Sequence, residues 1–191
     1  TGYAAEGGLD WSIQEIHGIT ATFFYQNIED WIQWVPGING VYRPQNIKEV
    51  RIKGMETNAE TNFKVGLVSF RTKAGYQFTR SVTKQTHDTD QAAVGKQLIY
   101  TPVHTGTAAL GSAYKTWSVN LFLQYSGERY TDASNSPIYA LDPFALVDFS
   151  VAKAWSQKRH NVDFLLLVKN LFGTTYQLYS GRAMPGRNFT L

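Results

Sequence analysis

The fold is decided by WSVNLFLQY, the stretch Trp117–Tyr125, in which apolar and polar residues alternate. Every odd-numbered position in it is apolar, and every even-numbered position except Phe122 is polar. Successive side chains of a β-strand point to opposite faces, so this pattern predicts a strand with one apolar and one polar face.

The same period of two recurs along the chain. It is found around residues 19–26, 65–80, 147–155 and 161–169, and such repetition is typical of an antiparallel all-β protein. The apolar positions of residues 45–63 change parity at Gly54, which predicts a β-bulge there. The pattern as a whole predicts strands over residues 1–13, 18–34, 46–63, 66–80, 97–114, 117–130, 144–156, 160–171 and 187–191.

The predicted connections alternate in length. Short ones fall near residues 14–17, 64–65, 115–116 and 156–159, and long ones at residues 35–45, 81–96, 131–143 and 172–186. Tight turns at one end and long loops at the other are typical of an outer-membrane barrel, whereas a soluble sandwich has no reason to alternate in this way. Several strands also reach the roughly 9–11 residues that cross a bilayer at a tilt.

The number of predicted strands is odd, although bacterial single-chain barrels close with an even number. We therefore expect an antiparallel transmembrane β-barrel fragment of about nine strands whose N-terminal barrel strands lie outside this chain. The last strand, residues 187–191, would then pair with a first barrel strand upstream of Thr1.

Composition and motifs limit the possible functions. Lys and Arg exceed Asp and Glu by only three charges and are scattered, which speaks against a nucleic-acid partner. The chain has no Cys, and no catalytic or phosphate-binding motif occurs in it, so we expect no enzyme, cofactor or thiol chemistry. We also expect no metal site, because the four histidines lack a second ligand nearby and the stretch 87–90, HDTD, lacks the spaced oxygen ligands of a calcium loop.

Several stretches resemble the TonB-dependent outer-membrane receptors. The Asn170-Leu171-Phe172 turn, followed by Tyr176 and by residues 181–189, GRAMPGRNF, is similar to the C-terminal end of those receptors, in a wording common among Bacteroidetes. Residues 24–32 and 46–56 resemble a barrel strand running into an extracellular loop and the strand after it. Residues 126–132, SGERYTD, resemble a strand end that the family writes as Gly-x-Arg-Tyr-x-Asp.

The resemblance implies a fold, a location and partners. The family has a barrel of about 22 strands with an N-terminal plug, lies in the outer membrane of Gram-negative bacteria and takes up scarce nutrients. The implied ligands are ferric siderophores, haem, cobalamin or glycans, and the implied partners are outer-membrane lipid and TonB. Residues 1–191 would be the C-terminal portion of the barrel, because the plug and the TonB box are absent from them and the chain stops before the usual terminal aromatic residue. A passive porin or structural barrel, and a soluble β-sandwich binding module, are the alternatives.

Three groups of residues are candidates for roles in such a barrel. Polar residues expected to face the lumen are Arg71, Lys73, Asp148 and Asp163. Aromatic residues expected at the membrane interfaces, which a soluble sandwich would instead bury in its core, are Trp31, Trp117, Tyr125 and Trp155. Aromatic and Arg side chains are frequent in recognition surfaces, so the loop residues expected to contact ligand, each with a structural role as the alternative, are Trp34, Tyr42, Arg43, Tyr139, Tyr179 and Arg182.

Overall fold

The chain forms one large antiparallel β-sheet. The computed structural model describes residues 1–14, 17–36, 41–86, 91–157 and 160–191, so the stretch 87–90 lies outside the described residues. The sheet has nine strands in the order β1-β2-β3-β4-β5-β6-β9-β10-β11. These strands are β1 (Gly2–Ile13), β2 (His17–Pro36), β3 (Tyr42–Val65), β4 (Val68–Gln85), β5 (His104–Tyr114), β6 (Trp117–Ser126), β9 (Phe144–Gln157), β10 (His160–Lys169) and β11 (Asn188–Thr190).

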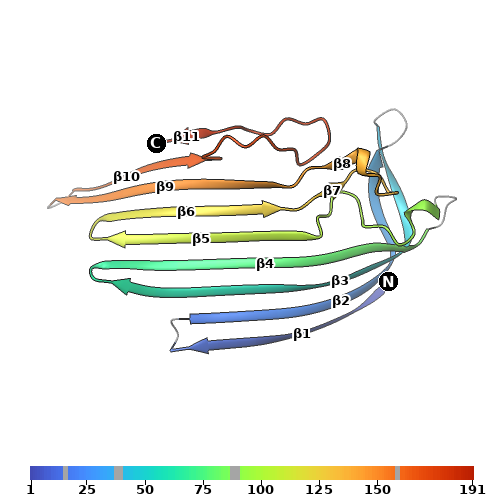
Figure 1. Ribbon diagram of the computed structural model, residues 1–191, viewed down its shortest axis with the longest axis horizontal. Helices are drawn as coiled ribbons and strands as arrows, with labels where there is room; N and C mark the ends of the chain where they lie inside the picture. The colour runs from blue at the N-terminus through green and yellow to red at the C-terminus, as the bar shows by residue number, and fades with distance from the viewer. Residues whose placement is uncertain (15–16, 37–40, 87–90, 158–159) are drawn as a thin grey trace.

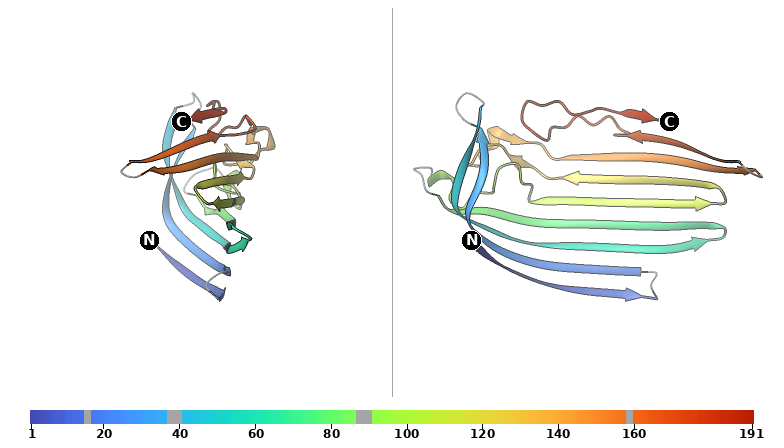
Figure 2. Two further views of the ribbon diagram at one scale, coloured as in Figure 1. Left: turned by 90° about the vertical axis from the view of Figure 1, so that its left-hand side faces the viewer. Right: turned by 180° about the vertical axis from the view of Figure 1, so that it is seen from behind.

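The sheet is a single curved layer (Figures 1 and 2). The β3–β4 and β5–β6 turns lie at one end of it, where β1 and β9 end and β2 and β10 begin, and the long connections after β4, β6 and β10 lie at the other. A small second sheet of β7 (Arg129–Tyr130) and β8 (Ala140–Leu141), together with the short 3-10 turns η1 (Gln91–Ala93) and η2 (Pro137–Tyr139), lies in those connections. The predicted nine-stranded antiparallel fragment is thus confirmed, and the sheet is not closed on itself. The long loop predicted at residues 35–45 is wrong, because β2 continues to Pro36 and β3 begins at Tyr42, and the two strands pair there. None of the described helical turns is long and apolar enough to cross a membrane.

The strand register separates an apolar face from a polar face. One row across the sheet contains only apolar residues, joined by consecutive strand pairs: Trp11, Ile19, Ala59, Ala74, Ala108, Leu123 and Val147. The adjacent row, on the other face, runs through Asp10, Thr20, Asn58, Gly75, Thr107 and Gln124. Large side chains on the apolar face are exposed, with Leu9 at 74%. In the described part of the chain no second layer covers this face, so it suits an apolar solvent.

Two predicted strands are shorter in the structure. The strand expected at residues 97–114 begins at His104, and Leu98 and Ile99, which precede it, are both buried. Residues 97–103 instead run along the end of β4, where the amide of Leu98 donates to the carbonyl of Ser81 at 2.8 Å. The strand expected at residues 117–130 ends at Ser126, and β7 leaves the large sheet to pair with β8.

The β-bulge predicted at Gly54 is wrong. Gly54 stays in register with Phe24 and Thr79, and the irregularity lies between Glu49 and Val50. Glycine is required there for space, because an added Cβ would lie 2.7 Å from the Phe24 ring and would overlap the carbonyl oxygen of Phe78.

The change of parity in β3 has a different cause. Val50, at 0% exposure, and Ile52 lie on the polar face by alternation, but near the loop end this face is covered. Val50 forms a buried cluster there with Ile47 and Leu98. The same face of β3 is therefore apolar near the loops and polar farther down the strand.

The close packing around Gly54 can be tested by substitution. We expect Gly54→Ala to lower the free energy of unfolding by about 1–3 kcal/mol, because backbone atoms as well as the Phe24 ring must move. Gly7→Ala is the matched control, since an added Cβ at this strand glycine meets nothing within 4 Å. It should change stability by about 0.5 kcal/mol or less. Thermal unfolding of the barrel in detergent micelles measures both, and equal midpoints for the two variants would contradict the packing role.

Candidate functional site

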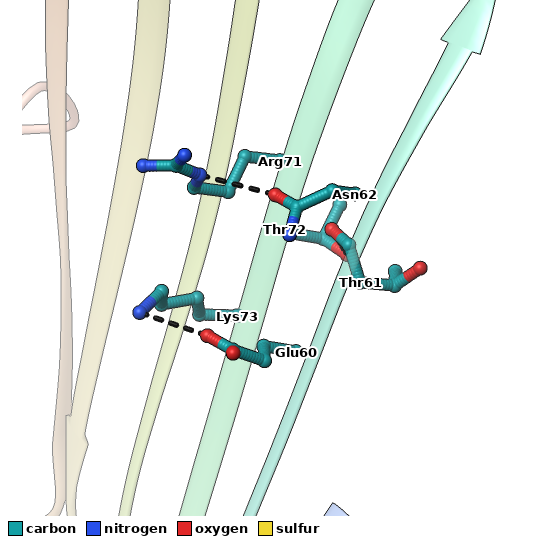
Figure 3. Close-up of polar contacts among 6 residues, drawn as sticks. All are labelled: Glu60, Thr61, Asn62, Arg71, Thr72 and Lys73. Carbon is teal, nitrogen blue, oxygen red and sulfur yellow. Dashed lines mark hydrogen bonds and ion pairs between the residues drawn. The ribbon is translucent and has the colours of Figure 1, made fainter. Parts of the chain in front are cut away.

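The polar face of β3 and β4 carries a cross-strand network (Figure 3). Lys73 Nζ lies 3.0 Å from Glu60 Oε2, and Arg71 Nε donates to Asn62 Oδ1 at 3.1 Å. The register places each pair directly opposite, so the strand ladder brings the charges together. Both members of the ion pair are exposed, which limits its contribution to about 1 kcal/mol at most. Arg71 and Lys73 thus lie with their partners on the polar face, and their position facing a lumen stays a prediction.

The two predicted carboxylates on this face differ in their surroundings. Asp148, in β9, accepts a hydrogen bond from the backbone N–H of Asn170 at 2.8 Å. Asn170 has φ 50° and is buried, and its carboxamide bonds both the N–H and the carbonyl of Thr174. Asp148 therefore holds the turn after β10 in place. Asp163 lies opposite Ala154 with an exposed side chain.

Three tyrosines meet at the loop end of the sheet. The hydroxyls of Tyr42 and Tyr100 are 3.1 Å apart, and the rings of Tyr100 and Tyr179 have centroids 5.4 Å apart. They come from the start of β3, from the β4–β5 connection and from the segment after β10, so the fold joins three distant parts of the sequence. Tyr42 and Tyr179 were predicted from sequence, whereas Tyr100 was not, because it fell in the strand expected at residues 97–114. We call these residues the tyrosine platform.

A partly buried clip made by the carboxamides of Gln97 and Asn135 supports the platform. The backbone N–H of Gln97 donates to Asn135 Oδ1 at 2.7 Å, and Asn135 Nδ2 donates to the Gln97 carbonyl at 2.9 Å. The Gln97 side chain, in turn, accepts from the N–H of Ser81 at 3.1 Å. The N–H of Tyr100 donates to the carbonyl of Tyr130 at 2.8 Å, so the β4–β5 and β6–β9 connections form one body.

Arg129 is a buried cation at the loop end of the sheet. It is only 3% exposed, lies over the Phe144 ring at 4.9 Å and donates from Nη2 to the carbonyl of Asp142 at 3.2 Å. Phe144 also contacts Tyr176, with ring centroids 4.8 Å apart. Burial lowers the pKa of Arg129. In the Gly-x-Arg-Tyr-x-Asp stretch, Arg129 therefore packs the loops onto β9, while Asp132 accepts from the N–H groups of Ser134 and Ser136.

The other candidate loop residues are exposed. Trp34 and Arg43 lie on the extensions of β2 and β3, and Tyr139 is in η2. Arg182 is next to the platform, because its N–H donates to the carbonyl of Tyr179 at 3.1 Å. These positions leave their ligand contacts as predictions. No cluster of three potential metal ligands occurs among residues 1–14, 17–36, 41–86, 91–157 and 160–191.

The aromatic candidates do not share one environment. Trp117 and Tyr125 lie on the apolar face near opposite ends of β6, and Trp155 lies on the same face of β9 near the turn end. Trp31 instead packs against the buried cluster of Ile47, Val50 and Leu98. Asp30, with φ 55°, interrupts the strand alternation just before Trp31. The interface roles of all four remain predictions, and the surroundings of Trp31 are those of a packing residue.

The geometry defines a class of protein. A one-layer antiparallel sheet with an exposed apolar face, a polar face, tight turns at one end and packed loops at the other is the wall of a membrane-spanning β-barrel. The chain belongs to the family described as TonB dependent receptor-like, beta-barrel, whose model matches residues 1–171. This is a family of receptors in the outer membrane of Gram-negative bacteria and not of enzymes.

Solved structures similar to this chain are receptors of the same kind. The ferric-catecholate import receptor Fiu from K12 E. coli is 25% identical, with a TM-score of 0.70 over 97% of this chain and 26% of its own. BauA, the ferric preacinetobactin receptor from Acinetobacter baumannii, is 16% identical, with a TM-score of 0.74 over 97% of this chain and 28% of its own. The ferric yersiniabactin uptake receptor FyuA from Yersinia pestis is 18% identical, with a TM-score of 0.70 over 96% and 27%. The chain thus spans little more than a quarter of these receptors.

The carboxamide clip predicts different effects for two substitutions of Asn135. Asn135→Gly removes both hydrogen bonds to Gln97 but tolerates φ 56°, so it should weaken the loop body by about 1–3 kcal/mol. Asn135→Ala adds about 1–2 kcal/mol of left-handed strain. Hydrogen exchange at residues 97–103 should increase from wild type to Gly to Ala, while Asn161→Ala, at the turn end, leaves it unchanged. Faster exchange in the Gly variant than in the Ala variant would refute this account.

The tyrosine platform predicts that the phenol of Tyr100 ionises at a higher pH than an ordinary tyrosine. Burial first, and then the hydrogen bond with Tyr42, raise the pKa of Tyr100 from 10.0 to about 12. Since the folded-state pKa is raised, the phenol's contribution to loop stability is complete below pH 10 and is lost as the pH rises through about 12. Absorbance titration should show this step, Tyr100→Phe should remove it, and Tyr42→Phe should move it to lower pH. A Tyr42→Phe variant with an unchanged step would exclude the hydrogen bond as a cause.

Proposed function

We propose that this chain forms wall and loops of a receptor that takes up a small nutrient across the outer membrane with energy from TonB. The observation that carries the proposal is the tyrosine platform at the loop end of a sheet whose family is that of TonB-dependent receptors. In this reading the apolar face contacts lipid, the polar face lines the lumen and the loops meet the ligand first. The plug and the contact with TonB would come from residues outside this chain.

Among the nutrients considered, we favour a ferric siderophore. Fiu, the receptor with 25% identity, is a ferric-catecholate importer by name, and this supports an iron chelate over haem, cobalamin or a glycan. Tyr42 and Tyr179 offer exposed ring surface, and partly buried Tyr100 holds both. Rigid aromatic side chains that are already packed lose little entropy when the aromatic rings of a catecholate chelate stack on them. Arg182 lies beside this surface and supplies a positive charge toward an anionic chelate.

A growth experiment tests the uptake. A strain that lacks the receptor should fail to grow under iron limitation on one ferric siderophore, and the complete receptor should restore growth only when TonB is present. Growth restored without TonB would favour a passive porin. Restoration on haem, cobalamin or a glycan, with no response to any ferric siderophore, would overturn the choice of substrate.

The platform itself can be tested by ligand binding to the purified receptor. We expect Tyr100→Ala to weaken ligand binding by about 1–2 kcal/mol, a fall of about five- to thirtyfold, because it removes the ring that positions both neighbours. Tyr114→Ala, an exposed tyrosine at the turn end, is the matched control and should bind as wild type does. Quenching of intrinsic fluorescence by the ferric siderophore measures the affinity. Equal affinity of the Tyr100→Ala variant and the wild type would remove the platform from the ligand site.

A further inference from the structure

The apolar face carries three cations close together near its loop end. Lys53 of β3 lies directly opposite Arg80 of β4, and Tyr25 of β2 is its partner on the other side. Arg51 is the next residue of β3 on this face, with its guanidinium 5.8 Å from the centre of the Tyr25 ring. Tyr3 stacks on Tyr25 with ring centroids 5.9 Å apart. We call Tyr3, Tyr25, Arg51, Lys53 and Arg80 the rim patch.

Two cations of the rim patch, Lys53 and Arg80, lie directly opposite each other on neighbouring strands and repel one another. Like charges directly opposite each other on neighbouring strands are destabilising. In the described part of the chain, none of the three rim cations has a carboxylate within 4.0 Å, and the Glu60–Lys73 ion pair lies on the polar face. The acidic groups of this face are Glu29 and Glu49, which lie opposite each other in the register and farther toward the loops.

Two buried polar atoms at the rim patch also lack partners. Arg51 Nε is buried without a hydrogen bond in the described part of the chain. Asn27, directly opposite Arg51 in the register, is only 7% exposed, and its Oδ1 is equally unpaired. A buried polar group without a hydrogen bond costs about 1–3 kcal/mol. The patch therefore has one buried donor, Arg51 Nε, and positive charge that the protein itself does not satisfy, whereas Asn27 Oδ1 is an acceptor.

The height of the rim patch identifies its occupant. The apolar face of β3 runs from Phe63 at the turn end to Met55, and Lys53 follows at about the 9–11 residues that cross the hydrocarbon at a tilt. Tyrosines are enriched where hydrocarbon meets headgroups, and Tyr25 and Tyr3 lie at this level. The layer that covers the patch is therefore the headgroup layer of the leaflet on the loop side. Lipid phosphates are the anions of such a layer.

We propose that the rim patch binds a phosphate-bearing lipid headgroup of the loop-side leaflet. Arg51 and Arg80 donate charge-assisted hydrogen bonds to phosphate oxygens, because one guanidinium group can donate two parallel N–H bonds to one phosphate. Lys53, between them, supplies a point charge. The phosphate offsets the Lys53–Arg80 repulsion and gives Arg51 an acceptor, so the bound lipid completes a strand surface that is otherwise strained by its own charges.

Native mass spectrometry of the complete barrel in detergent tests the proposal. The probes are phosphatidic acid, phosphatidylcholine and inorganic phosphate. We expect the barrel to bind phosphatidic acid in preference to phosphatidylcholine, and Lys53→Gln with Arg80→Gln to weaken that binding about tenfold or more. Lys115→Gln is the matched control, because Lys115 also lies over a tyrosine ring, that of Tyr114, but at the turn end. It should bind as wild type does.

Several results would overturn the proposal. An unchanged affinity in the double variant would do so, and so would an equal loss in Lys115→Gln, which would indicate general attraction of the anionic lipid to basic residues. Displacement of phosphatidic acid by inorganic phosphate at equal concentration would exclude a site for lipid. Lys53→Glu separates binding from folding, because it should weaken lipid binding yet raise the thermal midpoint in lipid-free nonionic detergent by pairing with Arg80. A fall in both would show a purely structural role.

Discussion

The rest of the structure depends on the hydrogen-bonded ladder between neighbouring strands. Hydrocarbon satisfies no backbone N–H or carbonyl group, so a strand at membrane depth must be paired along both edges. Once β1 to β6 and β9 to β11 are paired in sequence, the register alone determines which side chains share a face. The apolar row from Trp11 to Val147 and the polar row beside it follow from that register without a packed core beneath them. This is why a chain with few buried apolar residues still has a defined architecture.

The loop end of the sheet lies outside the hydrocarbon, in aqueous surroundings, and different interactions hold the chain there. Apart from the short β7–β8 pair, the segments there lie outside the large ladder. They are joined through side chains such as Gln97 and Asn135 and through buried Arg129. Residues with positive φ, among them Tyr100, Asn135 and Asn170, turn the chain where alternation stops. The tyrosine platform is built on these contacts and on the start of β3, so its geometry depends on polar loop contacts as well as on the sheet.

The same division explains what could be predicted from sequence. Alternation in Trp117–Tyr125 and its counterparts predicted the strands because each has one face in an apolar surrounding and one in a polar one. It failed at residues 97–103, where Leu98 and Ile99 are both buried, and this failure hid Tyr100. Gly54 was assigned a bulge because Val50 and Ile52 change parity, but that change reflects the loop cover at one end of the same face. When a distant loop covers part of a strand, the alternation of apolar and polar residues in that strand does not reveal the contact.

Resemblance and geometry also differ in what they reveal about individual residues. The Gly-x-Arg-Tyr-x-Asp stretch is one of those that point to the family, yet Arg129 and Asp132 bond within the loops and leave little for a ligand. Arg51 and Lys53 lie in the stretch 46–56 that resembles a family strand, and Arg80 lies outside the resembling stretches, but each alone is an ordinary strand cation. Only the register shows that they share one face and that Lys53 and Arg80 are directly opposed. In a one-layer sheet the motif residues therefore indicate how the chain is held together. Like charges that face each other on neighbouring strands indicate where a group outside the protein must supply the opposite charge.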